Sequence, residues 1–176
     1  AFPTIAMRGA VGFVYSEFNL EIGRDASIAA LEQALKEDNR VILVTQKDMA
    51  VEKPTKDDLY YFGLLAEIKK VIYLPGGGMR ITVRGLEKVK AEEYVSFEPY
   101  IKLIYMPAFE NEEEGIEIIA PAMASVESYF EHYSRINTKI SKEQARQALN
   151  TQDIAVKVNL IAGLIFATVE EKYAIF

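Results

Sequence analysis

Short hydrophobic stretches dominate the first part of the chain and predict β-strands. The clearest run begins at Met79, where Met79, Ile81 and Val83 alternate with polar residues, as expected for a strand with one buried face. Glycine, proline, asparagine and aspartate residues separate these runs. The predicted strands cover residues 4–7, 12–15, 20–22, 41–45, 64–74, 79–89 and 100–106.

One amphipathic helix interrupts the predicted strands. Ile28, Leu31 and Leu35 recur at three- and four-residue spacing, which places them on one face of a helix. Asp25 is suited to cap the start of this helix, and Asn39 suits its end. The first part of the chain is therefore expected to be a β-rich domain that carries one early helix.

The triple glycine at Gly76–Gly78 allows two interpretations, a phosphate-binding loop or the turn of a β-hairpin. A phosphate-binding loop leads into a helix and is followed by a Lys-Ser or Lys-Thr pair, and neither occurs here. Strand-like runs lie on both sides of the glycines instead. The pattern therefore favours a hairpin.

After about residue 110 the pattern becomes that of helices. Hydrophobic residues step by four and three along one stripe of a long helix, formed by Ile119, Met123, Val126, Phe130 and Tyr133. Pro121 lies inside this stripe and either kinks the helix or marks its first turn. A later helix has its main hydrophobic stripe at Ile154, Val158, Ile161 and Ile165.

Two capping boxes predict further helix starts. Ser141 stands three residues before Gln144, and Thr168 stands three residues before Glu171. The second box lies only about two helical turns before the final residue, Phe176. The chain is therefore predicted to be the N-terminal piece of a longer protein, cut at the start of a further helix.

Together these patterns predict an α+β protein with a β-rich domain over residues 1–110 and a helical subdomain over residues 111–176. The acidic run at 110–115 is either a flexible linker or the negatively charged first turn of the long helix. The helical interpretation is favoured because an apolar stripe starts directly after the run and because acidic residues complement the helix dipole.

The charge of the chain bears on its partners. The formal charge of −6 over 176 residues and the sequence pI near 5.0 repel polyanions such as nucleic acids. Six basic residues nevertheless gather around the predicted hairpin, namely Lys69, Lys70, Arg80, Arg84, Lys88 and Lys90. Glu67 and Glu87 interrupt this cluster, which favours a solvated hairpin face over an RNA-binding surface.

The residue types argue against several kinds of site. The chain has no cysteine and a single histidine, His132, so zinc sites and Ser-His or Cys-His catalytic arrangements are not expected. His132 itself is expected on the surface or rim of a helix. No apolar run reaches the roughly 20 residues of a membrane span, and the N-terminus lacks the apolar core of a signal peptide. A cytoplasmic protein without membrane contact is therefore expected.

Four segments in order carry a resemblance to a known family. They are "MRGAVGFVYSEFNLEIGRDASIAALEQAL", "TQKD" at Thr45–Asp48, "GLLAEIKKVIYLPGGGMRITVRGLEKV" and "LNTQDIAVKVNLIAGLIFATVEEKYAIF". Together they resemble the N-terminal domain of Lon, the ATP-dependent protease of bacteria and organelles, over nearly the entire chain. Two positions depart from the family pattern: Phe13 is not followed by the common proline, and Pro121 falls where an uninterrupted helix is expected.

The resemblance implies a PUA-like β-domain followed by a helical subdomain, joined in the whole enzyme to an ATPase module and a Ser-Lys protease module. It implies a homohexameric parent that uses ATP and Mg²⁺, whereas no cofactor is expected in this chain. Ser141 and Lys142 are adjacent, but a helix cap explains Ser141 better than a catalytic dyad. This chain by itself is therefore expected neither to hydrolyse ATP nor to cleave peptides.

The function that the resemblance implies is the recognition and tethering of unfolded or damaged protein substrates. Adaptable methionine and aromatic side chains suit such contacts, so the candidate substrate-binding residues are Met79, Tyr105, Met106 and Phe109. A place in the hydrophobic core is the alternative for each of them.

Two other functions stay open. In the first, the helical subdomain is an assembly scaffold that packs against neighbouring subunits, while the isolated chain is a monomer or a weak dimer. In the second, less favoured, the chain is an RNA-binding module, because PUA-like folds serve that purpose elsewhere.

Overall fold

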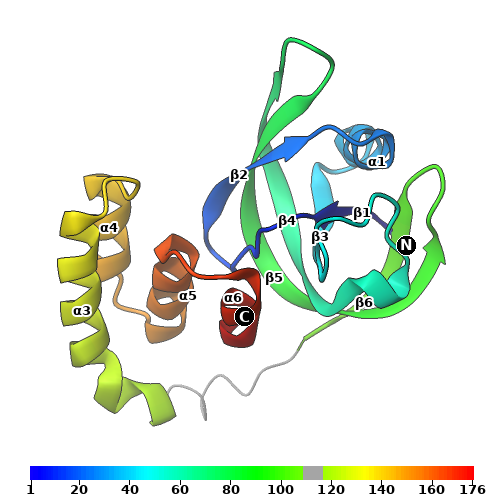
Figure 1. Ribbon diagram of the computed structural model, residues 1–176. Helices are drawn as coiled ribbons and strands as arrows, with labels where there is room; N and C mark the ends of the chain where they lie inside the picture. Colours follow the sequence, from blue (N-terminus) through cyan, green and yellow to red (C-terminus); the bar gives the residue numbers. More distant parts are fainter. Residues whose placement is uncertain (109–116) are drawn as a thin grey trace.

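The computed structural model describes residues 1–108 and 117–176 (Figure 1). Its first part is a six-stranded sheet formed by β1 (Phe2–Met7), β2 (Glu17–Ile22), β3 (Arg40–Gln46), β4 (Leu59–Tyr73), β5 (Met79–Ser96) and β6 (Ile101–Pro107). The strand order is β2-β5-β4-β3-β1-β6, and β6 pairs with β5 as well as with β1. The sheet therefore closes into a barrel, and β2 pairs with the first part of β5, beyond the stretch of β5 that pairs with β6.

The long strands β4 and β5 form the hairpin that the triple glycine predicts. The N–H of Leu74 donates a hydrogen bond to the carbonyl of Gly78 at 2.8 Å. Gly76 and Gly77 have φ angles of 104° and 97°, which side chains with a Cβ atom rarely adopt. The hairpin is confirmed, and the glycines lead into a strand and not into a helix.

The early helix is α1 (Asp25–Lys36), which packs against β1 and β3. Its start differs from the prediction, because Arg24 is the N-cap residue and Asp25 is already the first helical residue. The helix dipole favours a carboxylate in this first turn. Asn39 does lie just beyond the end of the helix, where its φ of 59° and its hydrogen bond to the carbonyl of Ala34 reverse the chain.

The predicted strand at residues 12–15 is wrong. This segment contributes only an isolated bridge between Val14 and Gly85. The N–H of Tyr15 donates to the carbonyl of Gly85, the N–H of Gly85 donates to the carbonyl of Ser16, and Tyr15 has a positive φ of 66°. The chain therefore turns back against β5 at this point instead of extending.

Two hydrophobic clusters fill the β-rich part, and β3 contributes to both. Val41 and Leu43 face the cluster that α1 covers, whereas Ile42 and Val44 face the cluster inside the barrel. All four side chains are almost completely buried. A strand that is covered on both faces becomes uniformly hydrophobic, which explains the unbroken apolar sequence here.

The helical part contains, among the described residues, a helical stretch at 117–119, η2 (Ala120–Ala122), α3 (Met123–Ile136), α4 (Lys142–Asn150), α5 (Ile154–Leu164) and α6 (Val169–Ile175). Pro121 lies in η2, so it marks the turn before α3 and does not kink that helix. The Oγ atom of Ser141 accepts a hydrogen bond from the N–H of Gln144 at 3.1 Å, and Thr168 caps α6 in the same way. Both predicted capping boxes are confirmed.

The last helix, α6, lies against the barrel and not against α3 (Figure 1). The ring of Phe176 meets that of Phe13 edge to face at 5.7 Å, and the ring of Tyr173 stacks on Tyr60 at 3.9 Å. The boundary predicted at residue 110, like the acidic run beside it, lies outside the described residues. The division into two domains therefore stays a prediction.

Candidate functional site

A groove opens where the start of α1 approaches two loops of the barrel. We call this cavity of about 780 Å³ the α1 groove. Its walls are mainly apolar and include Ala6, Ala26, Pro54, Phe97, Pro99 and Ile101. Charged residues border it as well, namely Arg24, Asp25, Glu52, Lys53 and Glu98. A mostly apolar concavity with a few charges is the ordinary form of a binding site on a protein surface.

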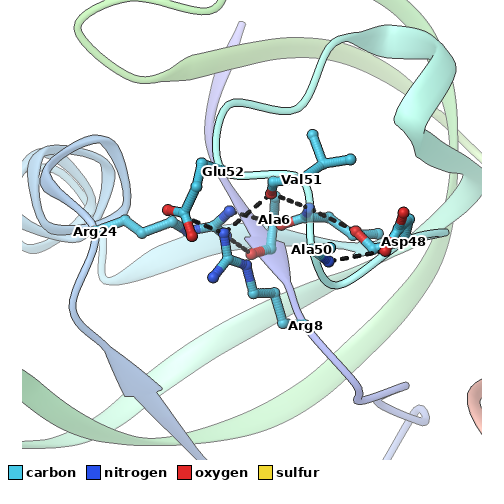
Figure 2. A network of polar contacts seen from close by, with 8 residues as sticks. Ala6, Arg8, Arg24, Asp48, Ala50, Val51 and Glu52 are labelled. Atoms are coloured by element: carbon cyan, nitrogen blue, oxygen red, sulfur yellow. Dashed lines mark hydrogen bonds and ion pairs between the residues drawn. The ribbon is translucent and has the colours of Figure 1, made fainter.

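Arg24 connects α1 to the strands below the groove. Its Nη1 atom donates a hydrogen bond to Oε1 of Gln46 at 2.6 Å, and its Nη2 atom donates to the carbonyl of Ala6 on β1 (Figure 2). Burial lowers the pKa of Arg24, and the positive charge of Arg8 lowers it further, while Glu52 opposes both. Arg24 therefore anchors the start of α1 to β1 and β3.

Gln46 and Arg8 fix the loop that forms the opposite wall of the groove. Gln46 is buried, and its amide nitrogen donates to the carbonyls of Asp48 and Val51 at 3.2 and 3.0 Å. Arg8 also donates to the carbonyl of Val51, at 3.0 Å, and its guanidinium lies 3.3 Å from a carboxylate oxygen of Glu52 (Figure 2). Arg8, just after β1, and Gln46, at the end of β3, thus hold this loop, and Arg24 holds Gln46 in turn, which makes this wall of the groove preorganised.

These three residues come from the segments that carried the family resemblance. Arg8 belongs to the opening Arg-Gly, Arg24 to the Gly-Arg turn, and Gln46 to "TQKD". The sequence does not indicate that they meet, because Arg8 and Gln46 are 38 positions apart in the chain. Parallel pairing of β1 with β3 brings them together.

A second apolar surface lies on the outer face of β4, β5 and β6. Met106 and Ile104 are exposed on β6, at 45% and 38%, and Tyr61 is exposed on β4. Lys90 pairs with Met106 across the strands and its Nζ atom lies 5.3 Å from the centre of the Tyr61 ring. Contact with the Tyr61 hydroxyl raises the pKa of Lys90, so this surface carries a stable positive charge. We call these four residues the Met106 surface.

The four candidate substrate-binding residues that the sequence suggested differ in their burial. Met79 is only 4% exposed and belongs to the core under α1. Tyr105 is half-buried, and its ring packs against Phe2 with centroids 5.4 Å apart. Met106 is exposed, and Phe109 lies outside the described residues. Among the three of these residues that the structure describes, Met106 is thus the one whose apolar side chain is exposed to a partner.

Another cavity, of about 570 Å³, lies between the turn after β1 and the helices α4 to α6. Its lining includes Tyr15, Phe18, Arg84, Leu160, Phe166 and Lys172. Burial lowers the pKa of Lys172, whose ammonium group points to the carbonyl of Gly163. This cavity lies at the junction of the barrel with the helices.

The basic cluster of the hairpin is partly neutralised. Arg80 forms an ion pair with Glu21 at 2.6 Å, and Lys69 forms one with Glu67 at the same distance. Arg84 lies opposite Glu17 in the register of β5 and β2, which places a carboxylate and a guanidinium on neighbouring strands. The hairpin therefore does not present an unbroken row of positive charge to a polyanion.

Two further observations limit the chemistry. Within residues 1–108 and 117–176, no three histidine, cysteine, aspartate or glutamate side chains gather closely enough to hold a metal ion. Of the helices in this part of the chain, none has the length and apolar character needed to cross a bilayer.

The fold can now be compared with known proteins. A solved structure of the N-terminal domain of Lon protease from the Mycobacterium avium complex superposes with a TM-score of 0.57 and covers 93% of this chain and 99% of that one. Its sequence identity is 14%, so this likeness establishes the fold alone. The α+β architecture, with a mixed sheet followed by helices, is therefore that of Lon N-terminal domains.

Sequence comparison gives the family. The family described as "ATP-dependent protease La (LON) substrate-binding domain" matches residues 1–176, and the chain belongs to this family. The Lon protease of Desulforamulus reducens is 32% identical over 172 residues, and that of Lachnoclostridium phytofermentans is 33% identical over 177 residues. These matches cover 98% and 97% of this chain and 21% of each relative. The chain spans about a fifth of the length of the curated relatives that it matches.

Proposed function

We propose that this chain is the non-catalytic, substrate-recognising part of a Lon-type ATP-dependent protease, and that it holds unfolded or damaged proteins for degradation. Membership of the substrate-binding family over all 176 residues supports this role. The parent would carry the ATPase and Ser-Lys protease modules, use ATP and Mg²⁺, act in the cytoplasm and form a homohexamer.

The observation that carries the proposal is the α1 groove. Its apolar walls offer room for the side chains that an unfolded protein exposes, and its volume of about 780 Å³ falls in the range of ordinary ligand pockets. The residues Arg8, Arg24 and Gln46 keep one wall fixed, so little conformational freedom is lost when a segment binds. The Met106 surface adds a second, more adaptable contact.

No catalytic role is proposed for the residues of this chain. The Oγ atom of Ser141, which stands beside Lys142, accepts the hydrogen bond of a helix cap, and the backbone N–H of Ser141 donates a hydrogen bond to the side-chain oxygen of Gln144. A serine held in this way stabilises the start of α4. The chain would therefore act by binding alone.

Fluorescence anisotropy of a labelled unfolded polypeptide, titrated with the purified chain, tests the proposal. Saturable binding that survives moderate salt is expected, with no binding of the folded version of the same polypeptide or of a single-stranded RNA of similar length. Ala26→Trp fills the exposed mouth of the α1 groove and is expected to weaken binding about tenfold or more.

The matched control is Lys36→Trp, which adds the same ring at an exposed position at the far end of α1. This variant is expected to bind like the unchanged protein. Equal binding by both variants would place the site elsewhere, and binding of RNA in preference to the polypeptide would contradict the proposed function.

A further inference from the structure

The α1 groove lies on the N-terminal end of α1, since the residues from Gly23 to Ser27 all line it. The first hydrogen bond of the helix runs from the N–H of Ile28 to the carbonyl of Arg24, at 2.9 Å. The N–H groups of the first three helical residues, 25–27, come before that bond, and the side chain of the N-cap residue does not cap them. Within the described residues these three donors have no acceptor.

Ser27, the third residue of α1, adds a hydroxyl to the same end of the groove. This residue lines the groove, yet it is only 6% exposed. Buried hydroxyls in proteins usually have a hydrogen-bond partner, because an unpaired one costs free energy. Among the residues that the structure describes, the Ser27 hydroxyl has no such partner. An acceptor atom bound in the groove would satisfy this hydroxyl together with the free N–H groups.

Arg24 brings a positive charge to these donors. Its guanidinium donates hydrogen bonds to two neutral acceptors, the side chain of Gln46 and the carbonyl of Ala6, and it forms no ion pair within the described part of the chain (Figure 2). Glu52, which also lines the groove, is paired with Arg8 instead. The N-terminus of a helix adds a partial positive charge of its own. This end of the groove therefore favours a negatively charged oxygen ligand such as a carboxylate.

Apolar walls accompany this group of donors, since Pro54, Phe97 and Ile101 line the same groove. A ligand that carries a carboxylate and an apolar side chain on the same carbon atom would contact both features. The last residue of a polypeptide has this form when its side chain is apolar, and backbone N–H groups are known to bind such chain ends.

We propose that the α1 groove binds the C-terminal carboxylate of a polypeptide whose last residue is apolar. The carboxylate oxygens accept hydrogen bonds from the start of α1 and from the Ser27 hydroxyl, and the last side chain packs on the apolar walls. This inference rests on the proposed function, because it names the part of a protein substrate that enters the groove.

Exposed charges at the groove narrow the choice of ligand further. Asp25 and Glu98 border it and form no ion pair among the described residues, and Lys53 brings one opposite charge. The two carboxylates repel a segment that carries several acidic side chains. A single terminal carboxylate offsets this repulsion through its hydrogen bonds, because solvent screens exposed charges more strongly than buried ones. The groove therefore suits a chain end and not an acidic segment.

Fluorescence anisotropy of labelled peptides, titrated with the purified chain, tests this inference. Two peptides share one sequence that lacks acidic residues and ends in leucine, and the last group is a free carboxylate in one and a carboxamide in the other. The free carboxylate is expected to bind at least about tenfold more tightly, because hydrogen bonds to a charged acceptor are stronger than those to a neutral one. A third peptide has a glutamate within the sequence and a carboxamide at its end, and it is expected to bind no more tightly than the carboxamide peptide.

A variant of the groove connects this preference to Ser27. Ser27→Ala removes one donor without adding bulk, and it is expected to lower the preference for the free carboxylate at least about threefold. Ser125→Ala is the matched control, because it removes an exposed hydroxyl on α3 and is expected to keep the full preference. Circular dichroism verifies that both variants keep their helices.

The inference and the proposed function fail in different ways. Equal binding of the carboxylate and carboxamide peptides, no binding of either, tight binding of the peptide with the internal glutamate, or an unchanged preference in Ser27→Ala would each overturn the carboxylate site. If the unfolded polypeptide still binds in those cases, the proposed function stands. If neither the peptides nor the unfolded polypeptide bind, the proposed function is contradicted together with the inference.

Discussion

The hydroxyl oxygen of Tyr173 on α6 accepts a hydrogen bond of 2.8 Å from the backbone N–H of Phe62 on β4. The two residues lie 111 positions apart in the chain. The hydrogen bond fixes the last helix to strand β4 of the sheet. Within the described residues, the hydrogen bond from Ser16 Oγ to the carbonyl of Asn159 ties the barrel to the helical part as well.

Tyr173→Phe is expected to lower the free energy of unfolding by about 1–2 kcal/mol, because a partly buried N–H loses its acceptor. Urea denaturation followed by circular dichroism measures the change. Tyr73→Phe is the control, since Tyr73 is 77% exposed at the end of the hairpin and its hydroxyl removal should be neutral. Equal stability of the two variants would contradict a structural role for the hydroxyl of Tyr173.

Tyr94→Phe is expected to leave the stability at pH 7 unchanged or to raise it slightly. The hydroxyl of Tyr94 is buried and has no hydrogen-bond partner among the described residues, so its removal leaves no group unsatisfied. Burial raises the pKa of Tyr94 to about 12, above the value of about 10 for an unfolded chain. A clear loss of stability in this variant at pH 7 would contradict this account of the hydroxyl.

The same pKa shift makes a prediction for alkaline pH. The folded state favours the neutral phenol, so the stabilisation from Tyr94 is complete below pH 10 and is lost as the pH rises from 10 to about 12. The free energy of unfolding, measured by denaturation at several pH values across this range, should fall less steeply with pH for Tyr94→Phe than for the unchanged protein. Equal slopes for the two proteins would show that Tyr94 ionises normally.

Glu127→Gln is expected to destabilise the helical part by about 1–3 kcal/mol. Lys157 on α5 is buried and forms an ion pair with Glu127 on α3, and the variant leaves its ammonium group without a countercharge. The value lies below that of a fully buried pair because the Glu127 side chain is 37% exposed. The double variant Glu127→Gln with Lys157→Met should recover most of the loss, as measured by thermal denaturation.

Gly85→Ala is expected to destabilise the protein by about 1–3 kcal/mol or more, because a Cβ atom there would overlap the backbone carbonyl of Phe13. Backbone atoms cannot move aside as a flexible side chain does. Gly23→Ala is the matched control, since its Cβ atom would meet no atom within 4 Å. Thermal denaturation of both variants measures the difference, and equal melting temperatures would contradict the close approach of the two chains.

Several elements follow from the sequence because they depend on neighbouring residues. The triple glycine between two strand-like runs predicts the hairpin, and the capping boxes at Ser141 and Thr168 predict the starts of α4 and α6. The order of strands and helices, and the four segments that identify the family, are likewise local features. Hydrogen bonds over three or four residues decide such elements, so no knowledge of the fold is required.

The tertiary structure decided what depends on residues distant in the chain. Residues 12–15 form a short apolar stretch that is typical of a strand, yet hydrogen bonds with Gly85 turn the chain back there. Met79 has a side chain that suits adaptable binding, but α1 packs over it and makes it part of the core.

The α1 groove is also a product of the tertiary structure, since parallel pairing of β1 with β3 brings Arg8 and Gln46 to the same loop. Periodicity tells which side of an element is apolar, whereas burial depends on what packs against that side. The sequence by itself therefore determined the elements and the family of this protein, while the exposed and enclosed surfaces were decided by packing between distant segments.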